Sequence, residues 1–242
     1  MTIGLVAATI RNNRIDEQIN EIEQYLSNNH NCDLLCFGEA YLHGFHGMSW
    51  EYEIDINRAI TLDSQSMEEL KGLAKEYDCG ISFGYIEKFS NKIYSSNIVI
   101  DNNGNILDNY RRISEGWKCN WENEHYAEGS SFQVFTYKGK QFVTAICGDF
   151  WWDYLIKEIE NLSKKVDVVL WPLYIDYSPE SWATNARQEY VNQVSSIHCP
   201  VLMINSYSPD ENEGKGGCCV FNQGHIENEL PVGERGILIK KI

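Results

Sequence analysis

Two side chains that could do chemistry stand where buried strands are expected to end. The apolar run 143–146 favours a strand and stops at Cys147, and the apolar run 32–37 stops just before Glu39. Chains that alternate strands and helices tend to carry their chemistry at such carboxyl ends. Cys147 is therefore a candidate nucleophile. The alternatives are a cysteine that packs as a small hydrophobe and a glutamate that lies in solvent.

A long loop is predicted between two of the strands, over residues 111–130. It is rich in aromatic residues, which argues against disorder, and loops of this length inside a domain are usually functional. It also carries cationic side chains, among them Arg112 and Lys118. His43 and His46 could ligate a metal, but without an obvious carboxylate partner we expect surface or supporting roles for both. No metal site is predicted.

Composition excludes several classes of protein. The 242 residues include 20 basic and 35 acidic side chains, a net charge of −15, which argues against nucleic acid and anionic membranes as partners. No apolar run approaches the ~20 residues of a membrane span. The first ten residues lack the basic start of a secretory signal and are expected to form a strand. Eight cysteines lie mostly in apolar runs without zinc-site spacing, so we expect reduced thiols and a cytoplasmic protein.

Strand and helix patterns alternate along the chain and indicate an α/β protein that forms a single domain over residues 1–242. Ser66 and Glu69 have the spacing of a capping box at the start of one helix. Helices are predicted over 16–27, 64–77, 153–163 and 179–197. Strands are predicted over 1–10, 32–37, 80–87, 94–100, 106–110, 132–137, 141–146, 166–171, 201–205, 216–221 and 236–242, with a turn at 222–225 before the last.

Five short motifs in this order resemble the carbon-nitrogen hydrolase, or nitrilase, superfamily, and the resemblance covers essentially the whole chain. Each motif is weak alone, whereas the ordered set is fairly specific. The motifs are Cys36-Phe37-Gly38-Glu39-Ala40, Tyr110-Arg111-Arg112, Ile146-Cys147-Gly148-Asp149, Leu170-Trp171-Pro172 and Arg187-Gln188-Glu189.

The resemblance implies a four-layer αββα sandwich, with two mixed sheets flanked by helices, that pairs into homodimers or larger homo-oligomers through its outer helices. It also implies a Glu-Lys-Cys triad that hydrolyses non-peptide C–N bonds of small amides, carbamoyl compounds or nitriles without metal or cofactor. On this basis Cys147 attacks the carbonyl, and Glu39, with a pKa raised by an apolar pocket, acts as general base and acid.

The sequence departs from the family at the triad lysine. The family usually reads Tyr-Arg-Lys, and here the third residue is Arg112. A guanidinium does not replace a compact ammonium without a change in geometry. We therefore assign the triad lysine to Lys118, six residues later in the same loop, with Arg112 as a substitute or supporting group. Glu122 matches an additional family carboxylate that would orient the lysine and the substrate.

Further residues are predicted to bind substrate. The backbone N–H of Gly148, just after the nucleophile, would stabilise an oxyanion. Trp151, Trp171 and Tyr174 could line the pocket, although aromatic residues at such positions are more often core. The leading hypothesis is a thiol amidohydrolase that acts through an acyl-thioester on Cys147. The alternatives are an acyl transferase that uses the same thioester and a catalytically silent binding or assembly subunit.

Overall fold

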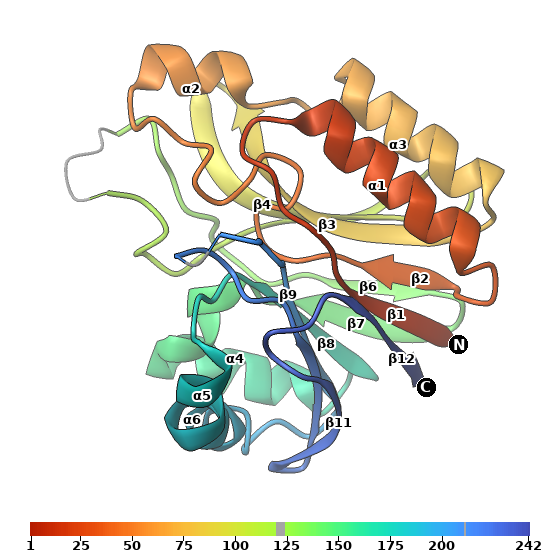
Figure 1. The fold of residues 1–242 in the computed structure, drawn as a ribbon, viewed down its shortest axis with the longest axis vertical. Helices are drawn as coiled ribbons and strands as arrows, with labels where there is room; N and C mark the ends of the chain where they lie inside the picture. Colours follow the sequence, from red (N-terminus) through yellow and green to blue (C-terminus); the bar gives the residue numbers. More distant parts are fainter. Residues whose placement is uncertain (120–123, 211) are drawn as a thin grey trace.

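Two six-stranded sheets lie face to face at the centre of the computed structural model, which describes residues 1–119, 124–210 and 212–242 (Figure 1). The first sheet has the order β12-β1-β2-β3-β4-β5, and its central pairs β1–β2 and β2–β3 are parallel. Its strands are β1 (Thr2–Ala7), β2 (Leu34–Cys36), β3 (Gly80–Phe89), β4 (Lys92–Ile100), β5 (Ile106–Arg111) and β12 (Gly236–Lys241).

The second sheet has the order β11-β10-β9-β8-β7-β6, with parallel pairing of β7 with β8 and of β8 with β9. All six residues of β8 are buried, as expected for a strand covered on both faces. The strands are β6 (Val134–Tyr137), β7 (Lys140–Thr144), β8 (Val168–Leu173), β9 (Val201–Asn205), β10 (Cys218–Asn222) and β11 (His225–Leu230).

Helices cover the outer face of each sheet (Figure 1). The first sheet carries α1 (Ile15–Asn28) and α3 (Gln65–Glu76), with α2 (Tyr52–Arg58) near one end, and the second carries α4 (Asp153–Ser163) and α6 (Arg187–Gln193). Between α5 (Pro179–Ser181) and α6 lies the π-helical turn η2 (Trp182–Ala186). Three apolar clusters fill the spaces between the four layers. The predicted αββα sandwich is confirmed.

Several predicted elements differ from the observed ones. Helix α2 and strand β11 follow no strong apolar pattern and were not expected, and β11 pairs with β10 at the exposed edge of its sheet. The predicted helix 179–197 ends at Gln193 and is interrupted by η2. The predicted capping box of α3 is wrong, because Ser64 caps that helix by accepting from Met67 N at 3.3 Å.

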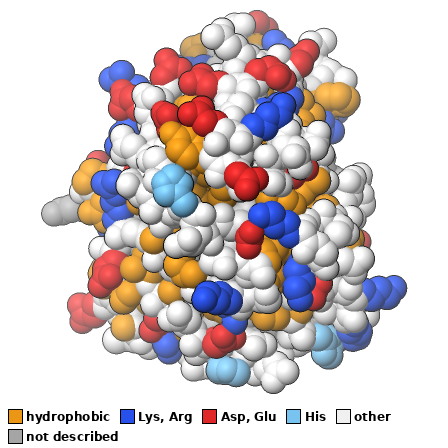
Figure 2. Space-filling model, turned by 90° about the vertical axis from the view of Figure 1, so that its right-hand side faces the viewer, with side chains coloured by type: hydrophobic (Ala, Val, Ile, Leu, Met, Phe, Trp, Pro, Cys, Tyr) orange, Lys and Arg blue, Asp and Glu red, His pale blue; other side chains and the backbone are white. Residues whose placement is uncertain are grey.

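Acidic and basic side chains are interspersed on the face at the right of Figure 1, which Figure 2 shows from the front. A single basic patch, as a nucleic-acid surface would need, is not seen on this face. Among the described residues no helix combines the length and apolar character that a membrane crossing requires.

Gly84, in β3, allows the chain that follows β2 to approach the sheet closely. Its N–H donates to Gly38 O at 3.1 Å, and its carbonyl accepts from Leu42 N at 3.0 Å. A Cβ atom at this position would lie 2.3 Å from Ala40 N and 2.8 Å from the carbonyl carbon of Glu39. The segment that carries Glu39 therefore depends on the missing side chain of Gly84.

We predict that Gly84→Ala lowers the free energy of unfolding by about 1–3 kcal/mol, because the added methyl group meets rigid backbone. The matched control is Gly72→Ala, in α3, where a Cβ atom meets nothing within 4 Å. That substitution should raise stability by about 0.5–1 kcal/mol, since alanine favours a helix interior. Urea unfolding measures both, and equal effects of the two substitutions would contradict the close approach at Gly84.

Candidate active site

Cys147 lies just beyond the carboxyl end of β7 and begins the 3-10 turn η1 (Cys147–Trp151). Its φ of +38° is in the left-handed region, which costs a residue with a side chain about 1–2 kcal/mol. The indole Nε1 of Trp171, in β8, donates to the Cys147 carbonyl at 3.0 Å and holds this conformation. The backbone N–H of Tyr174 lowers the pKa of the thiol. The sulfur is thus presented at the strand end that the sequence predicted.

Asp149 fixes the turn that carries Cys147. Its Oδ2 accepts from Ile146 N at 2.7 Å and from Tyr110 Oη at 2.6 Å, and its Oδ1 accepts from Ser114 N at 2.8 Å. The carboxylate is fully buried. It therefore ties the Cys147 turn to β5 and to the loop that follows β5. The sequence analysis quoted Asp149 within a motif but gave it no role.

Glu39 follows β2 of the other sheet and is 1% exposed. Its Oε1 accepts from Arg112 Nη1 at 2.9 Å and from Ser95 Oγ at 3.5 Å. Its Oε2 is buried and has no hydrogen-bond partner among the described residues. One carboxylate oxygen is therefore held in place, and the other is available to take a proton.

Arg112 lies between Glu39 and the turn that follows Cys147. Its Nε donates to Ser114 Oγ at 2.8 Å, and its side chain is 6% exposed. A Cβ atom on Gly148 would lie 2.2 Å from Arg112 Nη2, so the guanidinium occupies the space that a larger residue at position 148 would fill. The structure thus brings Glu39, Arg112 and Gly148 together beside Cys147.

Burial dominates the electrostatics of the two groups that would exchange a proton. It raises the pKa of the Cys147 thiol to about 12, and the negative charge of Glu39 adds to this rise while Arg112 and the Tyr174 N–H oppose it. Burial also raises the pKa of Glu39, and the charge of Arg112 works against that rise. In the resting site the sulfur therefore keeps its proton, and Glu39 holds a proton more readily than an exposed carboxylate does.

Lys118 makes other contacts. Its Nζ donates to Tyr126 O at 2.9 Å and lies 2.8 Å from Glu128 Oε1. The cation against Glu39 is Arg112, not the Lys118 to which the sequence analysis assigned this role. The reason lies in the path of the loop: Ser114 and Asp149 hold the loop just after Arg112 against the Cys147 turn. Glu122 lies outside the described residues.

The three aromatic residues predicted to line the pocket lie in different places. Trp171 is fully buried and supports the Cys147 backbone, as described above. Trp151 is 39% exposed, with its ring against Tyr190. Tyr174 stacks on Phe45 with ring centroids 4.2 Å apart, so it bridges the two halves of the sandwich next to the thiol.

A small cavity of about 10 Å³ lies against Glu39. Most of its wall is apolar or aromatic and comes from the chain after Glu39 and from the loop after β5. Its lining residues are Glu39, Ala40, Phe45, Met48, Trp50, Ile86, Ser95 and Trp117. A cavity of this size has room for about one water molecule.

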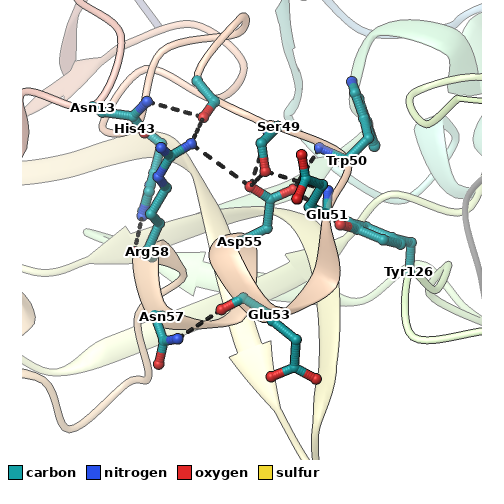
Figure 3. A network of polar contacts seen from close by, with 11 residues as sticks. Asn13, His43, Ser49, Trp50, Glu51, Glu53, Asp55, Asn57, Arg58 and Tyr126 are labelled. Carbon is teal, nitrogen blue, oxygen red and sulfur yellow. Dashed lines mark hydrogen bonds and ion pairs between the residues drawn. The ribbon is translucent and has the colours of Figure 1, made fainter.

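Asp55, at the buried side of α2, holds the cavity wall that follows Glu39 (Figure 3). Its Oδ1 accepts from Ser49 N and Oγ at 2.9 and 2.8 Å, and its Oδ2 accepts from Trp50 N and Tyr126 Oη at 2.8 and 2.9 Å. These bonds keep Trp50 in a left-handed conformation with φ of +63°. The wall is therefore rigidly anchored.

His43 lies in the same region, and its ring forms hydrogen bonds with backbone groups. Its Nδ1 accepts from Ile86 N at 3.1 Å, which leaves Nε2 to donate to Arg58 O at 3.1 Å. Burial lowers the pKa of His43 to about 4. Both ring nitrogens are thus engaged in a neutral imidazole. Among the described residues, no group of three or more His, Cys, Asp or Glu side chains could hold a metal ion.

Comparison with known proteins identifies the family. The model of the carbon-nitrogen hydrolase family matches residues 2–242. This chain belongs to the carbon-nitrogen hydrolase family. The predicted resemblance is confirmed.

Curated members of the carbon-nitrogen hydrolase family are distant in sequence. A probable nitrilase from Schizosaccharomyces pombe is 26% identical over 144 residues, which cover 58% of this chain and 49% of that protein. A citrullinase from Francisella tularensis is 25% identical over 163 residues, which cover 64% and 56%. The chain spans about half or less of the length of the first nitrilases that it matches.

Solved structures share the carbon-nitrogen hydrolase fold over nearly the full chain. A variant of an amidase from Nesterenkonia, of the nitrilase superfamily, superposes with a TM-score of 0.80 at 16% identity, covering 99% of this chain and 90% of that one. A CN-hydrolase superfamily protein from Xanthomonas campestris, with an arsenic adduct in its active site, has a TM-score of 0.81 at 15% identity, covering 99% and 89%.

We predict that Glu39→Gln moves the pH at which alkylation of Cys147 by iodoacetamide rises to a lower value. The reason is that the Glu39 charge raises the pKa of the thiol, whereas Arg112 and the Tyr174 N–H lower it and remain in the variant. Mass spectrometry of the Cys147 peptide over a pH series measures the rate, and the half-exposed Cys119 in the same digest is the internal control. An unchanged or higher midpoint pH of alkylation would mean that Glu39 does not govern the charge of the thiol.

Proposed function

We propose that this protein is a thiol-dependent amidohydrolase that cleaves a non-peptide C–N bond of a small amide or carbamoyl compound. The observation that carries the proposal is the convergence of three groups from distant segments. The Cys147 thiol, the Glu39 carboxylate and the Arg112 guanidinium meet in one buried site beside a small cavity. The relatives are named as nitrilases and a citrullinase, and structural neighbours are named as amidases, which supports this class of chemistry.

The first half of the proposed reaction forms an acyl-enzyme. Glu39 Oε2 takes the thiol proton as the Cys147 sulfur attacks the carbonyl carbon, and the carbonyl oxygen becomes an oxyanion. Arg112 and the Gly148 backbone N–H stabilise that charge. When the tetrahedral intermediate collapses, the C–N bond breaks and Glu39 returns its proton to the leaving ammonia or amine, which leaves a thioester on Cys147.

The second half releases the acid. Glu39 removes a proton from water, whose oxygen attacks the thioester carbon, and Arg112 faces the second oxyanion. Collapse breaks the C–S bond, and the proton held by Glu39 returns to the sulfur. The single carboxylate therefore serves as base and acid in both halves, which requires a pKa raised toward neutrality.

The position of Arg112 favours one alternative, a catalytically silent member of the family that binds or assembles. Its guanidinium stands where the family usually has a lysine, and it pairs with Glu39 at 2.9 Å. An acyl transferase would use the same thioester with an amine in place of water. Added hydroxylamine distinguishes the transferase, because hydroxamate would then form faster than free acid.

An ammonia-release screen over small amides, carbamoyl amines and nitriles tests the proposed function. We predict turnover of at least one neutral amide by the wild type and no turnover by Cys147→Ala, because the thioester cannot form without the sulfur. Intact-mass measurement should detect the acyl-enzyme in the wild type alone. If the folded protein releases ammonia from none of these compounds, the result would favour the catalytically silent alternative.

Substitution of the two loop cations tests the oxyanion assignment. We predict that Arg112→Ala lowers kcat/KM by about 10²–10³-fold, as expected for loss of an oxyanion donor. Arg112→Lys should keep more activity than Arg112→Ala because it retains the positive charge, and Lys118→Ala should have the smallest effect. Circular dichroism controls for folding, since Arg112→Ala leaves the buried Glu39 carboxylate without its partner. A larger loss of kcat/KM in Lys118→Ala than in Arg112→Ala would instead support Lys118 as the triad lysine, as assigned from the sequence.

A further inference from the structure

The side chain of Arg112 extends from a backbone that is held on both sides. Its N–H donates to Ser95 O at 2.9 Å, which continues the pairing of β5 with β4, and its carbonyl accepts from Gly129 N at 2.8 Å. A shift of this residue along the sheet would break both hydrogen bonds, which is costly for buried groups. The Cα atom of Arg112 is therefore fixed, and an arginine and a lysine at this position would differ in the side chain alone.

Each nitrogen of the Arg112 guanidinium has a partner from a different residue. Nε donates to Ser114 Oγ at 2.8 Å, Nη1 donates to Glu39 Oε1 at 2.9 Å, and Nη2 donates to Glu115 O at 3.4 Å. Ser114 is 1% exposed, and its own backbone N–H donates to Asp149 Oδ1 at 2.8 Å, so the backbone that carries its hydroxyl group is tied down. Partners at three nitrogens determine both the position and the rotation of a planar guanidinium.

Gly148 leaves room for one edge of this guanidinium. A Cβ atom at position 148 would lie 2.2 Å from Arg112 Nη2, 3.1 Å from Arg112 Cζ and 2.9 Å from Ser114 Oγ. All three of these nearest atoms belong to side chains, and Gly148 is not among the glycines with a positive φ. The backbone would therefore accept an alanine here. What excludes a larger residue is the head group of Arg112.

A lysine at position 112 would fit these surroundings less well. The atom of lysine that corresponds to the arginine Nε along the side chain is Cε, a methylene group that cannot donate to Ser114 Oγ. The ammonium nitrogen corresponds to Cζ, so lysine has no atom that would occupy the space beside Gly148, and it ends one bond farther from Glu39. The surroundings of position 112 are thus complementary to a guanidinium and not to an ammonium group.

We propose that Ser114 and Gly148 are positioning residues that hold the guanidinium of Arg112 in the candidate active site. Ser114 orients the guanidinium through Nε, and Gly148 provides the space that Nη2 occupies. This inference rests on the proposed function, because the two residues serve the reaction by keeping the cation where the oxyanion forms. Arginine in place of the usual family lysine is then one of three mutually dependent choices and not an isolated change.

A double-mutant cycle on the alkylation of Cys147 by iodoacetamide tests the role of Gly148 without a substrate. We expect Gly148→Ala to raise the midpoint pH of alkylation, because the added methyl group displaces the guanidinium that lowers the pKa of the thiol. In Arg112→Ala the same substitution meets no guanidinium and should leave the midpoint nearly unchanged. Gly72→Ala, where a Cβ atom meets nothing within 4 Å, is the matched control and should move neither midpoint. Equal shifts with and without Arg112, or no shift in either, would overturn the inference.

Urea unfolding of the same proteins covers the case in which the added methyl group prevents folding. Gly148→Ala should lower the urea midpoint of the wild type and should lower that of Arg112→Ala much less, because the clash is with the side chain that has been removed. An equal loss in both proteins would mean that the turn itself requires glycine at position 148, and the inference would fall.

The role of Ser114 is tested by turnover of an amide found in the ammonia-release screen. We expect Ser114→Ala to lower kcat at least about tenfold with little change in KM, because a guanidinium without its Nε partner is no longer directed at the oxyanion. In Arg112→Lys, which lacks Nε, Ser114→Ala should have almost no effect. Ser163→Ala, at a buried serine of α4 whose Oγ accepts from His198 N at 3.0 Å, is the matched control and should keep the wild-type kcat. Equal losses from Ser114→Ala in the wild type and in Arg112→Lys would overturn the inference.

The remaining outcomes separate the two proposals. Turnover that depends on Cys147, without coupling of position 112 to Ser114 or without its coupling to Gly148, would overturn this inference alone. Coupling of Gly148 with Arg112 in alkylation and unfolding, without release of ammonia from any amide, would support the inference and overturn the proposed function. If no amide is hydrolysed and Gly148→Ala acts equally with and without Arg112, both proposals fall.

Discussion

The buried ion pair between Glu39 and Arg112 is the interaction on which the site depends. Its partners come from the end of β2 in one sheet and from the loop after β5, and Cys147 follows the end of β7 in the other sheet. Removing two charges from water is costly unless each finds a well-placed partner. The pair therefore requires the sandwich to close in one arrangement, and that arrangement also places the thiol beside the carboxylate.

The backbone at Cys147, and at the residue just after Glu39, adopts conformations that are unfavourable for residues with a side chain. Cys147 has a φ of +38°, and Ala40, just after Glu39, has a φ of +49°. Each is held by neighbours, through Trp171 and Asp149 on one side and the close approach of Gly84 on the other. Strain of this kind at a site persists only where the surroundings over-determine it. Much of the packing near the cavity thus holds the side chains of Cys147 and Glu39 in position.

Sequence patterns predicted the alternation of strands and helices and the strand ends that carry Glu39 and Cys147, because long apolar runs and abrupt stops are local signals. The four layers were predicted from the resemblance to the carbon-nitrogen hydrolases. Neither the patterns nor the resemblance predicted which cation meets Glu39. That choice depends on the path of the loop after β5, which Ser114 and Asp149 determine through contacts across 35 residues of sequence. Edge strand β11 was missed because its exposed residues lack an apolar pattern.

The guanidinium of Arg112 has a further consequence for how the site handles charge. An arginine side chain keeps its proton throughout the range in which proteins remain folded, whereas an ammonium group in an apolar site can lose its own. In the proposed mechanism only the sulfur and the carboxylate then exchange protons with the reactants, while the positive charge of Arg112 stays constant. That mechanism uses one proton, passed between Glu39 and the group that faces it, and needs no relay of titrating groups to bulk solvent.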